Sequence, residues 1–330
     1  MKRNLIRLAG VLVLLTVLFA ALGWSNPAAL DKSNLFDVFN RHGALGVITL
    51  GAALLIITGA IDLSVGSVVG FSAVLFGVLM EEKYSPYTAF VIVLFCGSAI
   101  GFINGVLVTK LRLQAFLVTL CGMFVYRGLA RSLTPKQTGL MQVKEMHPDY
   151  VSSLDTLRYW LIGKSPDGEL VFPAQLIVLL VLGLILGIVL HRTVYGRYWY
   201  AIGYSEQAAR YAGVRVERMK IAAFVICSTL AAFAGILLLL NYGSANPSEA
   251  GNSYELYAIT AAVLGGCSLR GGEGLAIGFV LGALVQPLIL NLMIFLNVKS
   301  SAEPYVMGMI LLIGTIADEL IRRRSKVSRS

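Results

Sequence analysis

The acidic side chain best placed to do chemistry is that of Asp62, which stands between two apolar runs of the sequence. A carboxylate at the centre of a bilayer costs about 2.5–3.5 kcal/mol on insertion scales, so such residues often mark a functional site. Asp62 could therefore take part in proton movement. It could also form a structural turn or cap the helix that begins after Leu63 and Ser64, because a carboxylate there satisfies free backbone N–H groups. We favour this structural role.

A second candidate is a short polar segment in which Glu206, Ala209, Arg210 and Gly213 recur at three- or four-residue spacing. This spacing predicts a short helix that ends at Gly213. The helix would lie within the basic stretch 192–220, and it is too short to cross a membrane. The residues alone leave two interpretations open: an amphipathic connector that lies on lipid headgroups, or a docking helix for a cytoplasmic partner.

The sequence contains no complete catalytic or metal-binding motif. The run Gly163-Lys164-Ser165 looks like the end of a phosphate-binding loop, but that motif needs a glycine five positions earlier, where Arg158 stands. The three histidines are far apart, and the four cysteines form no CxxC pair, so a disulfide framework or a zinc site is not expected. We expect no enzyme activity, no metal, no cofactor bound by this chain and no ATPase of its own.

The composition indicates which elements must position these residues. Of the 330 residues, 57% are hydrophobic and only 14% are charged, whereas soluble domains carry about 25% charge. The mean hydropathy is +0.78. These values argue against a soluble enzyme, a disordered protein and a nucleic-acid binder, although the pI is near 9.4. We expect an all-α polytopic membrane protein in which residues 1–330 form one domain.

Apolar runs of membrane-crossing length follow one another along the whole chain. A helix rises about 1.5 Å per residue, so roughly 20 apolar residues cross a hydrocarbon core of about 30 Å. We expect about ten spans, two of which, 64–80 and 256–270, are short and interrupted by glycine. The other spans are expected near 5–24, 43–60, 87–109, 115–132, 173–191, 221–240, 275–296 and 304–321.

The charge pattern predicts the orientation of these spans. Most of the 27 basic residues gather at the N-terminus, in the stretch 192–220 and at the C-terminus. Lys and Arg collect in cytoplasmic loops, so we expect both termini and 192–220 in the cytoplasm and a long external loop at 134–172. The net charge of +9 then reflects topology and does not indicate a nucleic-acid partner.

Glycine spacing predicts close helix packing and a possible repeat. Small residues four apart let helix backbones approach in lipid, and three such groups occur: Gly97, Gly101 and Gly105; Gly274, Gly278 and Gly282; Gly183 and Gly187. The glycine-interrupted segments 59–66 and 265–272 are either two unrelated turns or the paired breaks of a transporter with an internal repeat.

Four amide side chains stand within the expected spans: Asn104, Asn241, Gln286 and Asn291. They are candidates to line a polar path through the membrane. Each could instead bridge two helices, because interhelical hydrogen bonds also use such side chains. We favour the bridging role for each.

The run Ile57–Ser67 resembles the signature of bacterial sugar ABC-importer permeases of the ribose-permease type. The residues of this signature turn are Gly59, Asp62, Leu63, Ser64 and Gly66. Further segments of the resemblance follow in the family's order: Asn104–Gly105, Val108–Lys110, Ala115–Leu120, Arg127–Leu129, Tyr195–Arg197, Tyr200–Gly203, Glu206–Gly213, Tyr254–Leu256, Ala258–Ile259 and Gly265–Leu269. The resemblance covers about residues 43–320. Two departures, at Ala60 and at Tyr204-Ser205, leave the transported sugar undefined.

The resemblance implies a permease of about ten helices in the bacterial inner membrane, where lipid surrounds it. It implies three protein partners: a second permease copy or paralogue, a cytoplasmic ATPase that holds ATP and Mg²⁺, and an external sugar-binding protein. It also makes the polar segment a coupling helix that contacts the ATPase through Glu206, Ala208, Ala209, Arg210 and Gly213.

Three rival functions remain to be compared with a sugar permease. The first is a proton-coupled secondary transporter that uses Asp62, and the second is a membrane enzyme, for which no catalytic cluster is found. The third is an ABC permease for branched-chain amino acids, against which the sugar-type signature around Asp62 argues.

Overall fold

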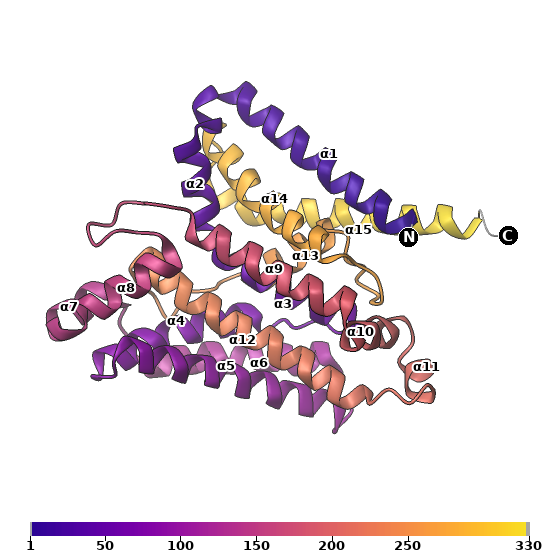
Figure 1. The fold of residues 1–330 in the computed structure, drawn as a ribbon, viewed down its shortest axis with the longest axis horizontal. Coiled ribbons are helices and arrows are strands. Elements are labelled where there is room, and N and C mark those ends of the chain that lie inside the picture. The colour runs from indigo at the N-terminus through magenta and orange to yellow at the C-terminus, as the bar shows by residue number, and fades with distance from the viewer. Residues whose placement is uncertain (1, 328–330) are drawn as a thin grey trace.

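The computed structural model describes residues 2–327, and within them the side chains of 8–299 and 301–316. Helices make up nearly all of it (Figure 1). The membrane-embedded helices and their neighbours are α1 (Lys2–Ser25), α2 (Lys32–Arg41), α3 (Gly43–Ile57), α4 (Val65–Glu81), α5 (Pro86–Thr109), α6 (Ala115–Leu133), α9 (Ala174–Arg192), α12 (Val216–Tyr242), α13 (Tyr254–Leu264), α14 (Ala276–Phe295) and α15 (Glu303–Val327).

The remaining elements are short. They are the 3-10 turns η1 (Pro27–Leu30), η2 (Pro148–Tyr150) and η3 (Ser300–Ala302), the helices α7 (Leu140–Met146), α8 (Val151–Ile162), α10 (Val194–Tyr204) and α11 (Glu206–Tyr211), and the strands β1 (Thr138–Gly139) and β2 (Ser244–Ala245). Strand β1 pairs antiparallel with β2, with Thr138 opposite Ala245.

The expected all-α membrane architecture is confirmed. In the described part of the chain, six helices are long and apolar enough to cross a membrane: α1, α5, α6, α9, α12 and α14. Helices α2 and α3 pass the same test together, although they are bent by 51° at a short break. Helices α4 and α13 and the apolar part of α15 are shorter. Each expected span therefore contains a helix, and two of the short ones, α4 and α13, are those predicted to be interrupted by glycine. The expected span 256–270 is too long, because α13 ends at Leu264, before the glycine-rich segment.

Helix α3 forms the centre of the bundle, since all 15 of its residues are buried. Helix α12 packs on α3, α4 and α5, α6 packs on α4, and α1 packs on α14. In Figure 1 these contacts place α5 and α6 along one side and α1 along the opposite side. Both interrupted helices, α4 and α13, contact α3 or α12, so the core of the bundle holds the breaks in place.

Small residues let the helices approach closely, as the sequence predicts. A Cβ at Gly101 would lie 2.5 Å from the Phe224 backbone oxygen, and one at Gly278 would lie 2.1 Å from that of Gly265. The second glycine series is shorter than expected, because Gly274 has φ +152° and precedes α14. Only Gly278 and Gly282 of that series belong to the helix.

The two ends of the bundle carry different elements. The expected loop 134–172 folds into β1, α7, η2 and α8 at one end, and α10 and α11 occupy the stretch 192–220 at the other (Figure 1). The start of α1 and the end of α15 lie toward the end that carries α10 and α11. The basic side chains at the two termini, on which the predicted orientation partly rests, lie outside the described residues.

Candidate functional site

Three chain segments from distant parts of the sequence meet where α3, α10 and α13 end. The Gly272 N–H donates to the Ile57 carbonyl oxygen at 2.8 Å. A Cβ at Gly203, near the end of α10, would lie 1.8 Å from that same oxygen and 2.4 Å from the Gly272 nitrogen. We call this meeting of Ile57–Gly59, Gly203–Tyr204 and Gly271–Gly272 the glycine junction.

The glycine junction needs glycine for two separate reasons. Gly59, Gly271 and Gly272 have φ values of +81°, +85° and +74°, which only glycine adopts at little cost. Gly203 is required by the close approach of backbone atoms rather than by its own conformation. The two predicted interruptions are therefore in direct contact in the fold, while the proposal that they belong to an internal repeat stays a prediction.

Asp62 lies inside the broken segment between α3 and α4 and is 4% exposed. Its Oδ1 accepts hydrogen bonds from the Ser64 backbone N–H at 2.7 Å and from the Ser64 hydroxyl at 2.5 Å. The Asn104 amide donates to the Ser64 Oγ at 3.3 Å, and the Tyr126 hydroxyl donates to the Asn104 Oδ1 at 3.1 Å. These bonds connect the turn before α4 to α5 and α6, so the geometry suits a turn anchor.

The polar segment forms the short helix α11, which begins at Glu206. The Ser205 hydroxyl accepts from the Ala208 N–H at 3.2 Å and so caps its first turn. Gly213 follows the helix with φ +83°, a conformation that favours glycine at a helix end. Of the predicted contact residues, Ala208 and Gly213 are exposed, whereas Ala209 is buried.

Ion pairs fasten α11 to the first turns of α12. Glu206 lies 2.5 Å from the Lys220 Nζ, and Arg210 lies 2.5 Å from a Glu217 carboxylate oxygen. The same Glu217 contact raises the pKa of Arg210 above its usual value. Glu206 and Arg210, which the sequence assigns to partner contact, thus also brace α11 within this chain.

Two aromatic side chains beside α11 escaped the sequence prediction. Tyr204 is 84% exposed and Tyr211 is 80% exposed. Large aromatic side chains this exposed are typical of interaction surfaces. A usable sequence signal was present, because Tyr204 precedes and Tyr211 ends a short helix whose other residues are small, polar or charged.

A cleft of about 600 Å³ separates α11 from the signature turn. Gly59 and Ala60 line one side, and Glu206 and Arg210 line the other. Arg112, in the connection between α5 and α6, contributes a further charge to its wall. The two segments that the sequence singled out separately therefore face each other across one polar opening.

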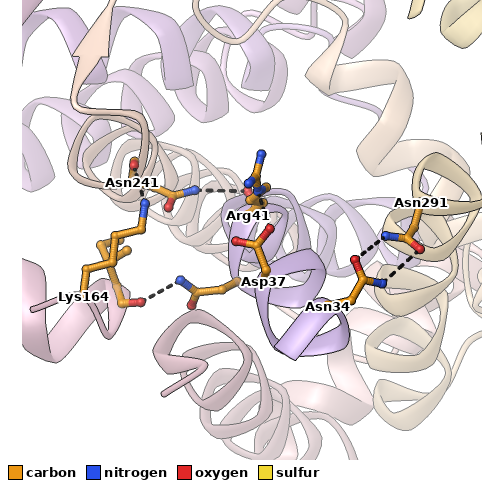
Figure 2. A network of polar contacts seen from close by, with 8 residues as sticks. Asn34, Asp37, Arg41, Lys164, Asn241 and Asn291 are labelled. Atoms are coloured by element: carbon orange, nitrogen blue, oxygen red, sulfur yellow. Dashed lines mark hydrogen bonds and ion pairs between the residues drawn. The ribbon is translucent and has the colours of Figure 1, made fainter. Parts of the chain in front are cut away.

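The four amides predicted to line a path do not share one place. Asn104 belongs to the Asp62 network. Near the opposite end of the bundle, Asn291 and Asn34 exchange reciprocal amide hydrogen bonds of 3.4 Å, as Figure 2 shows. Asn241 donates to the Arg41 carbonyl oxygen at 3.4 Å (Figure 2). Gln286 is buried, and its amide has no partner among the described residues.

Charged side chains join the amides at this end of the bundle. We call the whole group the outer network and define it as Asn34, Asp37, Arg41, Lys164, Asn241 and Asn291 (Figure 2). Arg41 pairs with Asp37 at 2.7 Å, and the Lys164 Nζ donates to the Asn241 carbonyl oxygen at 3.0 Å. Partial burial, with Arg158 as a further cause, lowers the pKa of Lys164. Three of the four amides thus bridge helices or chain segments, while a path role for any of them stays a prediction.

The fold and this site define a class of protein. Helices of membrane-crossing length, together with shorter apolar helices that begin or end at glycine turns and a short polar helix held against those turns, are typical of a transport permease. The family model described as "Branched-chain amino acid transport system / permease component" matches residues 34–315. The chain belongs to this permease family.

Three curated permeases are similar to this chain over most of their length. The ribose import permease protein of Escherichia coli K12 is 33% identical, over 93% of this chain and 92% of its own. The protein of the same name in Bacillus subtilis 168 is 33% identical, over 89% and 87%. The autoinducer 2 import system permease protein of Salmonella typhi is 34% identical, over 98% and 90%. No solved structure matches the chain.

These similarities confirm the predicted class: the chain is a permease subunit of an ABC importer. They do not support the proton-coupled transporter as an alternative. The family description names branched-chain amino acids, whereas the relatives described above are named for ribose and autoinducer 2.

Proposed function

We propose that this chain moves a monosaccharide inward across the bacterial inner membrane, with energy from a separate ATPase subunit. The observation that carries this proposal is the similarity to ribose import permeases over almost the whole length of both chains. In this proposal ATP and Mg²⁺ bind to the ATPase, and this chain binds no cofactor. An external sugar-binding protein delivers the sugar, and a second permease copy or paralogue completes the route.

The proposed orientation puts α10, α11 and both chain termini in the cytoplasm. Three basic residues of the 192–220 stretch, Arg197, Arg215 and Arg218, are exposed there, in agreement with the excess of Lys and Arg in cytoplasmic loops. The segment 134–172 would then face the outside. Its folded elements, β1, α7 and α8, give a binding protein a surface to meet.

The glycine junction supplies a route for energy coupling. Helix α11 would rest on the ATPase through Ala208, Gly213 and the exposed tyrosines. The ion pairs to α12 keep α11 from moving independently of the bundle. Gly203 lies two residues before Ser205, the residue that caps α11, and touches Ile57 and Gly272, so a displacement of α11 reaches both broken helices directly. ATP can drive transport only if the ATPase favours one of the two permease states, outward-open or inward-open, over the other.

The test is co-purification of the ATPase from solubilised membranes, followed by ATP-dependent ribose uptake in the same cells. We expect Ala208→Trp to lose both the ATPase and uptake, because the bulky ring would stand on the docking face. The matched control is Met141→Trp, on α7 at the other end, where Met141 is 69% exposed. Uptake that is stopped by an uncoupler alone, with no ATPase bound to the wild-type chain, would contradict the proposal.

A further inference from the structure

Arg127, Asn252 and Glu255 form a charged cluster between α6 and the start of α13. The Arg127 Nη1 donates to the Asn252 Oδ1 at 2.9 Å, and its Nη2 lies 3.8 Å from the Glu255 Oε1. The Glu255 side chain is 9% exposed and that of Arg127 is 27% exposed. Asn252 is exposed. The cluster thus joins a buried carboxylate to a guanidinium and an amide that reach the molecular surface.

The signature turn makes room for the carboxylate of this cluster. A Cβ at Gly66 would lie 2.0 Å from the Glu255 Oε2, so the glycine leaves the space that this oxygen occupies. The same oxygen has no hydrogen-bond partner among the described residues. Beside it, Ser253 has φ +63°, which is uncommon for a residue other than glycine. Such backbone strain persists only where the surroundings hold it in place.

The lengths of α6 and α13 place the cluster inside the membrane rather than at its surface. At 1.5 Å per residue, Arg127 stands about 18 Å along α6 from Ala115 and about 9 Å from the end of the helix at Leu133. Glu255 stands about 15 Å along α13 from Gly265, where the glycine-rich segment begins. The hydrocarbon core is about 30 Å thick, so an α6 that spans it carries Arg127, and with it Glu255, within the core. Arg127 points sideways to Asn252 and Glu255 rather than along the helix toward an interface.

A guanidinium at this depth does not face lipid without a large cost. Arginines inside membranes instead face a bundle interior or a water-filled cavity. The surface that carries Arg127 and Asn252 is therefore turned toward water or protein in the assembled importer, and the other exposed side of α6 is left for lipid.

We propose that Arg127, Asn252 and Glu255 line the route through the importer and form a subsite that binds sugar hydroxyl groups within the membrane. This inference rests on the proposed function. A guanidinium donates through several N–H groups, while an amide both donates and accepts. Hydroxyl groups that leave water need such partners, because burying a hydroxyl group without a hydrogen bond is unfavourable. Glu255 keeps the guanidinium in place through its Oε1 and does not itself contact the sugar.

Thiol accessibility tests which side of α6 faces water. Phe124 and Val125 are neighbours with similar exposures of 67% and 55%. At about 100° per residue, Phe124 lies about 60° from Arg127 around the helix, and Val125 lies about 160° away. The pair Phe124→Cys and Val125→Cys, each with Cys96 and Cys121 replaced by serine, is therefore matched in depth and exposure but not in direction.

We expect a membrane-impermeant thiosulfonate to modify Phe124→Cys at least about tenfold faster than Val125→Cys in membranes that contain the assembled importer. The reactive species is the thiolate, and each unit by which an apolar environment raises the thiol pKa lowers its fraction about tenfold. Equal rates, or faster modification of Val125→Cys, would overturn the subsite. Co-purification of the ATPase is measured on the same samples, so a failure of the proposed function is recognised separately.

A second measurement separates sugar binding from a merely structural ion pair. Arg127→Gln and Asn252→Ala should each raise the KM for ribose uptake, with ribose as the probe, while the ATPase still co-purifies. The double variant Arg127→Gln/Glu255→Gln removes both charges and so relieves the unpaired carboxylate. If the double variant restores the wild-type KM, the pair is structural and the subsite is wrong. A KM that stays raised supports the subsite.

Discussion

The glycine junction and the outer network hold opposite ends of the bundle in physically different ways. At the glycine junction, backbone meets backbone, as in the 2.8 Å bond from Gly272 to Ile57. In the outer network, side chains from α2, α12, α14 and the connection after α8 make hydrogen bonds of up to 3.4 Å (Figure 2). Direct backbone contact leaves no freedom to repack, whereas side-chain hydrogen bonds can be exchanged for others at small cost. The first end suits the transmission of force, and the second suits opening and closing.

The largest effect is expected from Gly203→Ala, which places a methyl group 1.8 Å from the Ile57 carbonyl oxygen. Overpacking that forces the backbone to shift typically costs about 1–3 kcal/mol, and occasionally more. We expect a lower thermal unfolding temperature of the detergent-purified chain and loss of ATP-dependent uptake. The control is Gly128→Ala in α6, where a Cβ meets nothing within 4 Å; its stability should change by no more than about 1 kcal/mol. An unchanged unfolding temperature and unchanged uptake in Gly203→Ala would contradict the close backbone contact at the glycine junction.

The next largest effect is expected at Asp62, which anchors the turn beside the junction. Asp62→Ala removes the acceptor of two Ser64 hydrogen bonds, each worth about 1.5–3 kcal/mol when the acceptor is charged. Asp62→Asn keeps an acceptor oxygen at the same place, so it should lose less stability and retain uptake. The measurement is uptake with and without an uncoupler, together with thermal unfolding. Loss of transport in Asp62→Asn with unchanged stability would favour a protonation role and contradict the turn anchor.

Sequence reasoning recovered the spans but not the contacts between them. The helices α5, α12 and α14 are predicted by hydropathy. Gly97 and Gly101 predict the close packing of α5, because residue spacing along one helix can be read from the local sequence. Gly203 carries no such signal, since its need for glycine arises from Ile57 and Gly272, which are far away in the sequence. The pairing of Arg127 with Glu255 is equally non-local. Helix α10 was missed because it has only 11 residues, most of them aromatic, small or polar, and is too short for a span.

A smaller effect is expected in the outer network, where replacing Asn291 removes one pair of reciprocal amide bonds to Asn34. Interhelical hydrogen bonds inside membranes average about 0.6 kcal/mol in double-mutant cycles. We therefore expect Asn291→Leu, Asn34→Leu and the double variant to give a coupling free energy of about that size, measured by denaturant titration of the chain in detergent. A coupling free energy as large as the cost of Gly203→Ala would mean that both ends of the bundle are equally rigid.

The smallest effect on stability is expected from the ion pair of Glu206 with Lys220. This ion pair links the surface helix α11 to the membrane helix α12. Glu206 is 47% exposed, and exposed ion pairs contribute about 0.2–1 kcal/mol. Lys220→Met should therefore barely change the unfolding temperature of the chain. It should nevertheless weaken coupling, because α11 would then move without carrying α12 along. The measurement is the number of ATP molecules hydrolysed per sugar imported, which should rise in Lys220→Met and stay unchanged in the control Lys136→Met, an exposed lysine at the opposite end of the bundle. An unchanged ratio would mean that force passes through Gly203 alone, and the brace between α11 and α12 would then serve only to position the docking face.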